Sequence, residues 1–133
     1  MKSDGLISSF KYAIEGIKKA YKAERNLKIH AFAMIIVILL GFILKIAVWE
    51  WVVCIVLFAL VIGAELFNTS IEEVVNLLSP EIRIHAKYAK DIAAGAVLVN
   101  AFFAAVVGCI ILIPTIISLF KKIKSIVNCT ILF

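Results

Sequence analysis

Three long apolar blocks dominate this chain of 133 residues. They cover about residues 29–48, 51–75 and 92–120, and each is long enough to cross the hydrocarbon core of a bilayer as a helix. Hydrophobic residues make up 64% of the sequence and the mean hydropathy is +1.10, well above the values of soluble domains. Because backbone polar groups in lipid must be satisfied within their own segment, the blocks predict an all-α membrane protein with three transmembrane helices.

The segment before the first block, residues 1–28, predicts an amphipathic helix on the membrane surface. In residues 3–24, apolar side chains recur every three or four positions and lysines occupy the remaining faces. No signal peptide is expected, because these charged residues precede the first apolar block. We expect the whole chain, 1–133, to form a single domain that consists of the surface helix, the three spans and a tail from 121 to 133.

The distribution of basic residues predicts partners and orientation. The formal net charge is +5 and the lysines and arginines lie beside the apolar blocks, so anionic headgroups or a polyphosphate ligand are expected as partners rather than nucleic acid. Residues 1–28 contain seven Lys and Arg, the 77–91 connection contains three, and the opposite side receives four. The positive-inside rule therefore places the N-terminus and the 77–91 connection of this multi-pass cell-membrane protein in the cytoplasm.

The stretch from Gly63 to Asn76 departs from the apolar pattern of the second block. Glu65, Asn68 and Glu72 are spaced at i, i+3 and i+7, so they share one face of a helix. A carboxylate inside a transmembrane helix is costly, and for this reason it marks a functional site by default.

Further polar residues are expected at the same membrane depth. Glu24 precedes the first span, and Lys90 and Asp91 precede the third, all at the predicted cytoplasmic side. The resulting group can reach both cytosolic solutes and lipid headgroups. We call it the polar cluster, and its members are Glu24, Glu65, Asn68, Glu72, Lys90 and Asp91.

The polar cluster suits phosphoryl transfer to a lipid at an active site on the cytoplasmic side. Glu24 and Glu72, near the water boundary, suit Mg²⁺, which takes one or two protein carboxylates and completes its shell with water and phosphate oxygens. A nearby lysine is a point-charge partner for phosphate. Glu65 precedes Glu72 by about two turns and lies deeper in the bilayer, where a poorly hydrated carboxylate suits a base that accepts a proton from an alcohol. The glycine-rich phosphate loops of soluble nucleotide-binding enzymes are absent from the sequence.

Two alternatives explain part of this pattern. The two span glutamates could pair with Lys90 and Arg25 simply to fix helix packing, with Asn68 as interhelical glue. The chain could also be a non-catalytic membrane subunit whose acidic face relays protons or cations, although this leaves the rest of the polar cluster unexplained. The two histidines, His30 and His85, are too isolated to suggest a metal pair and are expected to be solvated at the interface.

Two motifs carry a resemblance to a known family. The chain contains Glu65-x-x-Asn68-Thr69-x-Ile71-Glu72 and, where the third span opens, Lys90-Asp91-x-Ala93-x-Gly95-Ala96-Val97. With Glu24 at the family's spacing before the first motif, roughly residues 5–120 resemble the prokaryotic diacylglycerol kinase family. The resemblance implies a homotrimeric inner-membrane lipid kinase that uses Mg-ATP, with an active site shared between neighbouring protomers.

The resemblance also implies a role for each matching residue. Glu65 resembles the base that deprotonates the lipid hydroxyl. Glu24 and Glu72 resemble the metal ligands that hold the ATP phosphates, and Asn68 resembles a residue that orients the catalytic group or the substrate. The other implied nucleotide contacts are Tyr12, Lys90 and Asp91.

The substrate branch is indicated by a shorter run. Glu24-Arg25-Asn26-x-x-x-His30 resembles the branch that phosphorylates undecaprenol, a long polyisoprenoid alcohol, to undecaprenyl phosphate for cell-wall synthesis. The branch that converts diacylglycerol to phosphatidic acid is the alternative. The tail from Ser125 to Phe133 matches no family pattern, so the resemblance implies nothing about its role.

Overall fold

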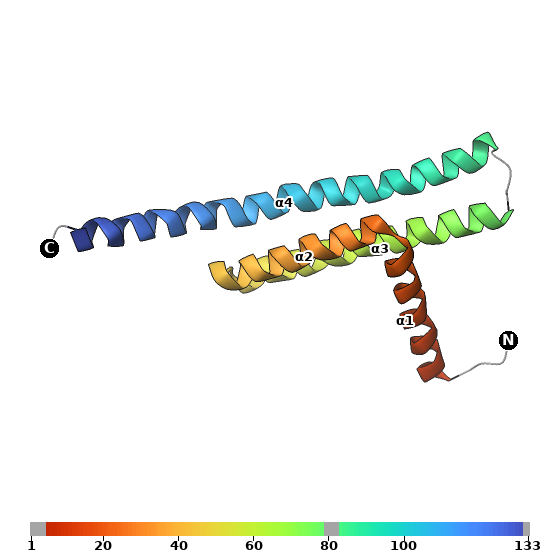
Figure 1. Cartoon of the computed structure of the whole chain (residues 1–133), viewed down its shortest axis with the longest axis horizontal. Coiled ribbons are helices and arrows are strands. Elements are labelled where there is room, and N and C mark those ends of the chain that lie inside the picture. The colour runs from red at the N-terminus through yellow and green to blue at the C-terminus, as the bar shows by residue number, and fades with distance from the viewer. Residues whose placement is uncertain (1–4, 79–82, 132–133) are drawn as a thin grey trace.

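The computed structural model describes residues 5–78 and 83–131, apart from the side chains of residues 126 and 128–131 (Figure 1). These residues form α1 (Leu6–Ala23), α2 (Arg25–Leu44), α3 (Val48–Leu78) and α4 (Ile84–Ile131), without a strand. By length and composition, α2, α3 and the Ile84–Ser125 part of α4 can each cross a membrane. The prediction of an all-α membrane protein with a surface helix and three transmembrane helices is confirmed.

The helices are longer than the predicted spans. Residues 84–91, expected in a connection, already belong to α4, and residues 121–131 of the expected tail continue it. With 1.5 Å per residue, the 48 residues of α4 extend for about 72 Å, more than twice the thickness of a hydrocarbon core. Helix formation therefore continues where the apolar block ends, because nothing in the adjoining polar sequence breaks it. Pro114 lies inside α4 without ending it, whereas Pro80 lies outside the described residues.

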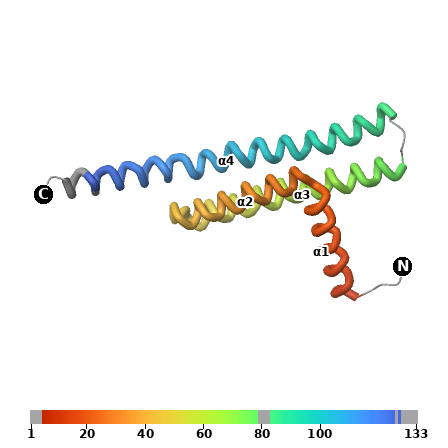
Figure 2. Tube along the Cα trace, viewed as in Figure 1, coloured from red at the N-terminus to blue at the C-terminus, as the bar shows by residue number. Residues whose placement is uncertain are grey.

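The three long helices lie alongside one another, and α1 projects steeply away from the start of α2, on the side opposite α4 (Figure 1). α2 and α3 form an antiparallel hairpin, and α4 makes its most extensive contact with α3. Near the hairpin turn, Ile46 packs with Cys54 of α3 and with Ile111 and Leu112 of α4. The C-terminal residues of α4 therefore extend past the turn, as the Cα trace in Figure 2 shows.

The turn between α2 and α3 is tight and well defined. Lys45 has a left-handed backbone (φ 53°, ψ 49°), and the Ile46 N–H donates to the carbonyl of Gly41 over 3.2 Å. This arrangement satisfies carbonyl groups that the end of a helix leaves free. The Ala47 N–H then donates to Oε2 of Glu50 over 2.6 Å, so the first turn of α3 caps its own start.

Buried apolar contacts concentrate near this turn. Half-buried Trp51 packs beside the buried core, its ring centroid lying 4.9 Å from that of Phe42. Large apolar side chains remain exposed along all four helices of the protomer, as expected for surfaces that face lipid or another subunit. The chain thus has an apolar core at the turn, and buried polar side chains lie toward the other end of α3.

We expect Gly41→Ala to destabilise the hairpin. A Cβ at Gly41 would lie 2.7 Å from Cη2 of Trp51 and 3.1 Å from Cδ1 of Ile46, so the indole must shift. Overpacking of this kind costs about 1–3 kcal/mol, which thermal unfolding in detergent micelles detects as a lower midpoint. Gly63→Ala is the matched control, because a Cβ there meets nothing within 4 Å, and alanine should raise helix stability slightly. Equal effects of the two substitutions would contradict close packing at Gly41.

Candidate active site

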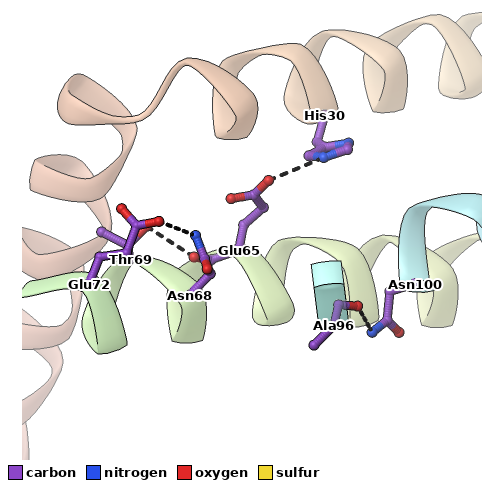
Figure 3. Close-up of polar contacts among 7 residues, drawn as sticks. All are labelled: His30, Glu65, Asn68, Thr69, Glu72, Ala96 and Asn100. Atoms are coloured by element: carbon purple, nitrogen blue, oxygen red, sulfur yellow. Dashed lines mark hydrogen bonds and ion pairs between the residues drawn. The ribbon is translucent and has the colours of Figure 1, made fainter. Parts of the chain in front are cut away.

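The C-terminal half of α3 carries the polar face predicted from the sequence. Glu65 is 1% exposed, Asn68 and Thr69 are also buried, and Glu72 is half-buried. Nδ2 of Asn68 donates to Oε1 of Glu72 over 3.1 Å, and Oγ1 of Thr69 donates to the backbone carbonyl of Glu65 over 3.0 Å (Figure 3). These bonds along one helix face hold the amide and the hydroxyl in fixed directions.

The Glu65 carboxylate meets His30 of α2. Its Oε1 lies 3.3 Å from Nε2 of the imidazole, and Figure 3 shows the two groups turned toward each other. The contact lacks the geometry of a hydrogen bond, so within the described residues both oxygens of Glu65 and Oδ1 of Asn68 are buried acceptors without a hydrogen-bond donor. Unfilled buried acceptors are costly. Three of them at one place favour a ligand that supplies hydrogen-bond donors, of which a lipid hydroxyl would be one.

The expectation that His30 is merely solvated is wrong. Its side chain is 24% exposed and faces the most buried carboxylate of the described structure. The role of this residue is not visible in its own segment of sequence, because its partner lies on another helix. One signal was available: a buried glutamate needs a donor at its own depth, and His30 begins the span that neighbours the Glu65 span.

Glu24 lies at the bend between α1 and α2. It ends the first helix and caps the second with an extended backbone (φ −91°, ψ 123°), and its N–H donates to the Ala20 carbonyl over 2.8 Å. Its half-buried carboxylate and that of Glu72 are both close enough for their charges to act on Glu65. The three carboxylates therefore act electrostatically on one site within the chain, whereas their roles stay predictions.

The remaining predicted residues are placed less closely. Nζ of Lys90 donates to Oδ1 of Asn76 over 2.7 Å. Asn76 follows Glu72 by four residues, so this ammonium group is held about one turn from Glu72 along α3. Asp91 is exposed on α4, and Tyr12 is 59% exposed on α1. The structure thus brings Lys90 to the polar face, whereas the nucleotide contacts of Asp91 and Tyr12 stay predictions.

These contacts differ from the packing alternative, in which Lys90 and Arg25 neutralise the span glutamates. Glu65 contacts His30, Glu72 accepts a hydrogen bond from an amide, and Lys90 donates to an amide. In the described part of the chain, the two carboxylates are therefore not taken up by ion pairs with those basic residues.

Two cavities meet beside His30. The first, about 360 Å³ in volume, is called here the polar chamber, and it is lined by polar side chains of α2 and α3 and by small or apolar side chains of α4. The second, about 320 Å³, is the apolar groove, which continues between the three long helices toward the hairpin turn. His30 and Ala101 line both. The polar residues that line the chamber are Asn26, His30, Glu65 and Asn68. The residues that line the groove include Met34, Val37, Cys54, Phe58 and Gly108.

The two cavities suit a molecule with a polar head and a hydrocarbon chain. The chamber offers hydrogen-bond acceptors, whereas the groove is almost entirely apolar and gains stability by covering hydrocarbon. Because both lie within the hydrophobic length of α2 and α3, the molecule would enter from the bilayer rather than from water.

The carboxylates also fit a divalent cation shared with phosphate. The described residues contain no group of three or more His, Cys, Asp or Glu side chains that could hold a metal by themselves. Mg²⁺ needs only one or two protein carboxylates when phosphate and water complete its shell, and Glu24 and Glu72 offer two. A cation held by these residues would offset the repulsion that Glu24 and Glu72 exert on Glu65.

Comparison with known proteins identifies the family. The model of the prokaryotic diacylglycerol kinase family matches residues 11–112, which include every residue of the polar cluster. An undecaprenol kinase of Bacillus subtilis is 38% identical over 106 residues, covering 80% of this chain and 86% of the relative. A diacylglycerol kinase of Synechocystis sp. is 39% identical over 115 residues, covering 86% of this chain and 66% of the relative. A diacylglycerol kinase of Haemophilus influenzae is 33% identical over 94 residues, covering 71% and 80%.

The resemblance seen in the sequence motifs is confirmed by these matches, and the non-catalytic relay subunit is set aside. The chain belongs to the prokaryotic diacylglycerol kinase family and is a membrane lipid kinase.

Proposed function

We propose that this lipid kinase transfers the γ-phosphate of Mg-ATP to the hydroxyl of undecaprenol, with Glu65 as the base. The proposal rests on one feature above all: a fully buried carboxylate, whose oxygens lack a hydrogen-bond donor, on the wall of a chamber that opens into an apolar groove. A lipid alcohol complements both parts, because its hydroxyl supplies the missing donor and its chain occupies the groove.

The chemistry follows from this placement. The lipid hydroxyl donates its proton to a carboxylate oxygen of Glu65, and the lipid oxygen forms a bond to the γ-phosphorus. The bond between that phosphorus and the bridging oxygen breaks, and ADP leaves with the electron pair. A base within hydrogen-bond reach of the hydroxyl typically contributes about 10²–10⁴-fold to the rate. Asn68, whose amide is held by its bond to Glu72, is proposed to orient the catalytic group or the substrate.

Glu24 and Glu72 are the proposed ligands of Mg²⁺. When bound, the ion supplies positive charge to the phosphate oxygens as the β–γ bond breaks. Lys90, whose ammonium group is held one turn from Glu72, is the proposed cationic contact of the phosphates. Asp91 and Tyr12 complete the proposed nucleotide contacts from the exposed side of the cluster.

Undecaprenol is proposed over diacylglycerol for two reasons. The relative named undecaprenol kinase matches along most of both chains, although a relative named diacylglycerol kinase is equally similar over a smaller share of its own length. In addition, Ala94, Val97, Leu98 and Ala101 form the α4 wall of the chamber and offer no side-chain donor. Diacylglycerol brings two ester groups beside its hydroxyl and would bury their carbonyls against this wall, whereas an isoprenoid alcohol carries no other polar group.

We also propose a homotrimer with its active sites on the cytoplasmic side. The basic residues of segments 1–28 and 77–91 outnumber those of the opposite side, which supports this orientation. Two features of the protomer support assembly: large apolar side chains exposed on every helix and a site that presents carboxylates with few basic partners. A neighbouring subunit could cover the exposed apolar side chains and supply basic partners to the carboxylates.

Glu65→Gln should remove the base while keeping the shape of the side chain. We expect kcat for lipid phosphorylation to fall by about 10²–10⁴-fold, with Mg-ATP binding little changed. The measurement is transfer of labelled phosphate to lipid in mixed micelles, together with nucleotide binding. Glu73→Gln is the control, since Glu73 lies on the same helix but is exposed. Near-normal turnover by Glu65→Gln would remove Glu65 from the chemistry.

Glu72→Gln should act on the nucleotide instead. Loss of one proposed metal ligand is expected to raise KM for Mg-ATP at least about tenfold, which corresponds to 1.4 kcal/mol of binding. Its neighbour Glu73 again provides the matched control. If Glu65→Gln and Glu72→Gln both abolish folding, as judged by size-exclusion profile and thermal midpoint, the packing alternative is favoured.

Substrate choice can be decided by direct competition. We expect kcat/KM for undecaprenol to exceed that for diacylglycerol by at least about tenfold in the same micelles, because the chamber wall disfavours esters. A reversed ratio would place the protein in the diacylglycerol branch while leaving the lipid kinase activity in place.

A further inference from the structure

His30 lies where the polar chamber, the apolar groove and Glu65 meet. Its Nε2 lies 3.3 Å from Oε1 of Glu65, and its side chain lines both the polar chamber and the apolar groove. It stands on α2, whereas Glu65 stands on α3, so the contact spans two helices. α2, which forms the hairpin with α3, thus places a polar side chain beside the Glu65 carboxylate.

The polar side chains nearest along α3 are committed elsewhere. The amide of Asn68 donates to Glu72 over 3.1 Å, and the hydroxyl of Thr69 donates to the backbone carbonyl of Glu65 over 3.0 Å. Neither holds the Glu65 carboxylate, which ends a flexible side chain next to a cavity of about 360 Å³. Without a contact from another helix, this carboxylate is free to adopt several rotamers, and its position relative to a lipid hydroxyl would not be fixed.

We propose that His30 is a positioning residue for Glu65: its Nε2, 3.3 Å from Oε1, donates a hydrogen bond to that oxygen once the lipid is bound and so holds the carboxylate with Oε2 ready to accept the proton of the lipid hydroxyl. Figure 3 shows the second oxygen on the side of the carboxylate away from the imidazole. As that proton reaches Oε2, the lipid oxygen bonds to the γ-phosphorus and ADP leaves with the bridging oxygen. His30 itself gains and loses no proton in this step. The inference rests on the proposed role of Glu65 as the base.

The position of His30 adds a second consequence. Because its ring lines both cavities, the hydroxyl of a lipid in the chamber and the first carbons in the groove pass the same side chain. A ring that fixes the base at this junction also fixes how far the hydroxyl enters. Alignment of this kind acts on kcat, since a displacement of about 1 Å can cost on the order of 10²-fold in rate.

Two amide substitutions separate donation from bulk. In His30→Gln, the amide nitrogen reaches approximately the place of Nε2, whereas the shorter side chain of His30→Asn reaches only that of Nδ1. We expect His30→Asn to lower kcat by about 10–100-fold and His30→Gln to retain most of it, with KM for ATP unchanged in both. His85→Asn is the control, because His85 is exposed and its ring lies beside Tyr88 rather than the site.

Several results would overturn the inference. These are normal kcat in His30→Asn, equal losses in the two amide variants, a change confined to KM for the lipid, and a lowered thermal midpoint in His30→Asn that accounts for its lost activity. His30→Gln is the control for lost stability, because both variants place a polar amide at the same position, which is 24% exposed. If His30→Gln is as stable as His30→Asn but more active, lost stability does not explain the loss of kcat.

A double substitution separates this inference from the proposed function. If His30 acts through Glu65, His30→Asn should cause no further loss of the residual activity of Glu65→Gln. Losses that multiply would show that His30 acts independently and would overturn the inference alone. Normal activity of Glu65→Gln would instead overturn the proposed function, whereas an inactive Glu65→Gln beside a fully active His30→Asn would leave that function standing and remove only the positioning role.

Discussion

The cost of a carboxylate within a membrane-spanning helix governs this structure. Glu65 is 1% exposed on a helix whose mean hydropathy marks it as a span, and burial of a charge is tolerated only with compensating contacts. His30 on α2 approaches the carboxylate and partly compensates its burial. On α3, the Thr69 hydroxyl donates to the backbone carbonyl of Glu65. Small side chains of α4 such as Ala94 line the cavity beside the carboxylate. The compensation is incomplete, because acceptors remain without donors. These unpaired acceptors favour the binding of a hydrogen-bond donor, and the hydroxyl of a lipid alcohol is such a donor.

The hairpin divides stability and chemistry between its two ends. At the turn, Ile46, Cys54, Ile111 and Leu112 form an apolar core, and Trp51 closes over Gly41. At the other end, α3 turns its polar face toward a chamber instead of packing it. Enzymes commonly have lower stability at the site of reaction and higher stability elsewhere, and here the apolar core on α3, at Cys54, lies about three helical turns from Glu65. The tight turn matters for function because it sets the register in which α2 presents His30 to α3.

Sequence reasoning succeeded where the determinants are local. Apolar block length gave the three spans, and helical periodicity alone placed Glu65, Asn68 and Glu72 on one face. It failed for contacts between helices: His30 looked isolated because nothing in its own segment reveals which side chain of α3 lies opposite. The ends of α4 were also misjudged, since hydropathy reports where lipid ends, whereas a helix ends only where capping or backbone geometry stops it. The bond from Lys90 to Asn76 is tertiary for the same reason and no spacing rule predicts it.

The spacing of Glu65 and Glu72 addresses the central problem of a lipid kinase, which must join an alcohol dissolved in the membrane to a nucleotide dissolved in water. Seven residues of helix separate the two carboxylates by about 10 Å along the axis. One rigid helix therefore holds the proposed base at the depth of the lipid hydroxyl and the proposed metal ligand nearer the water boundary, with Asn68 between them and bonded to Glu72. Glu24 approaches from the bend between α1 and α2, where the chain leaves the surface and enters the span. The proposed site thus spans the membrane boundary, and α3 fixes the spacing between the proposed base and the proposed metal ligand.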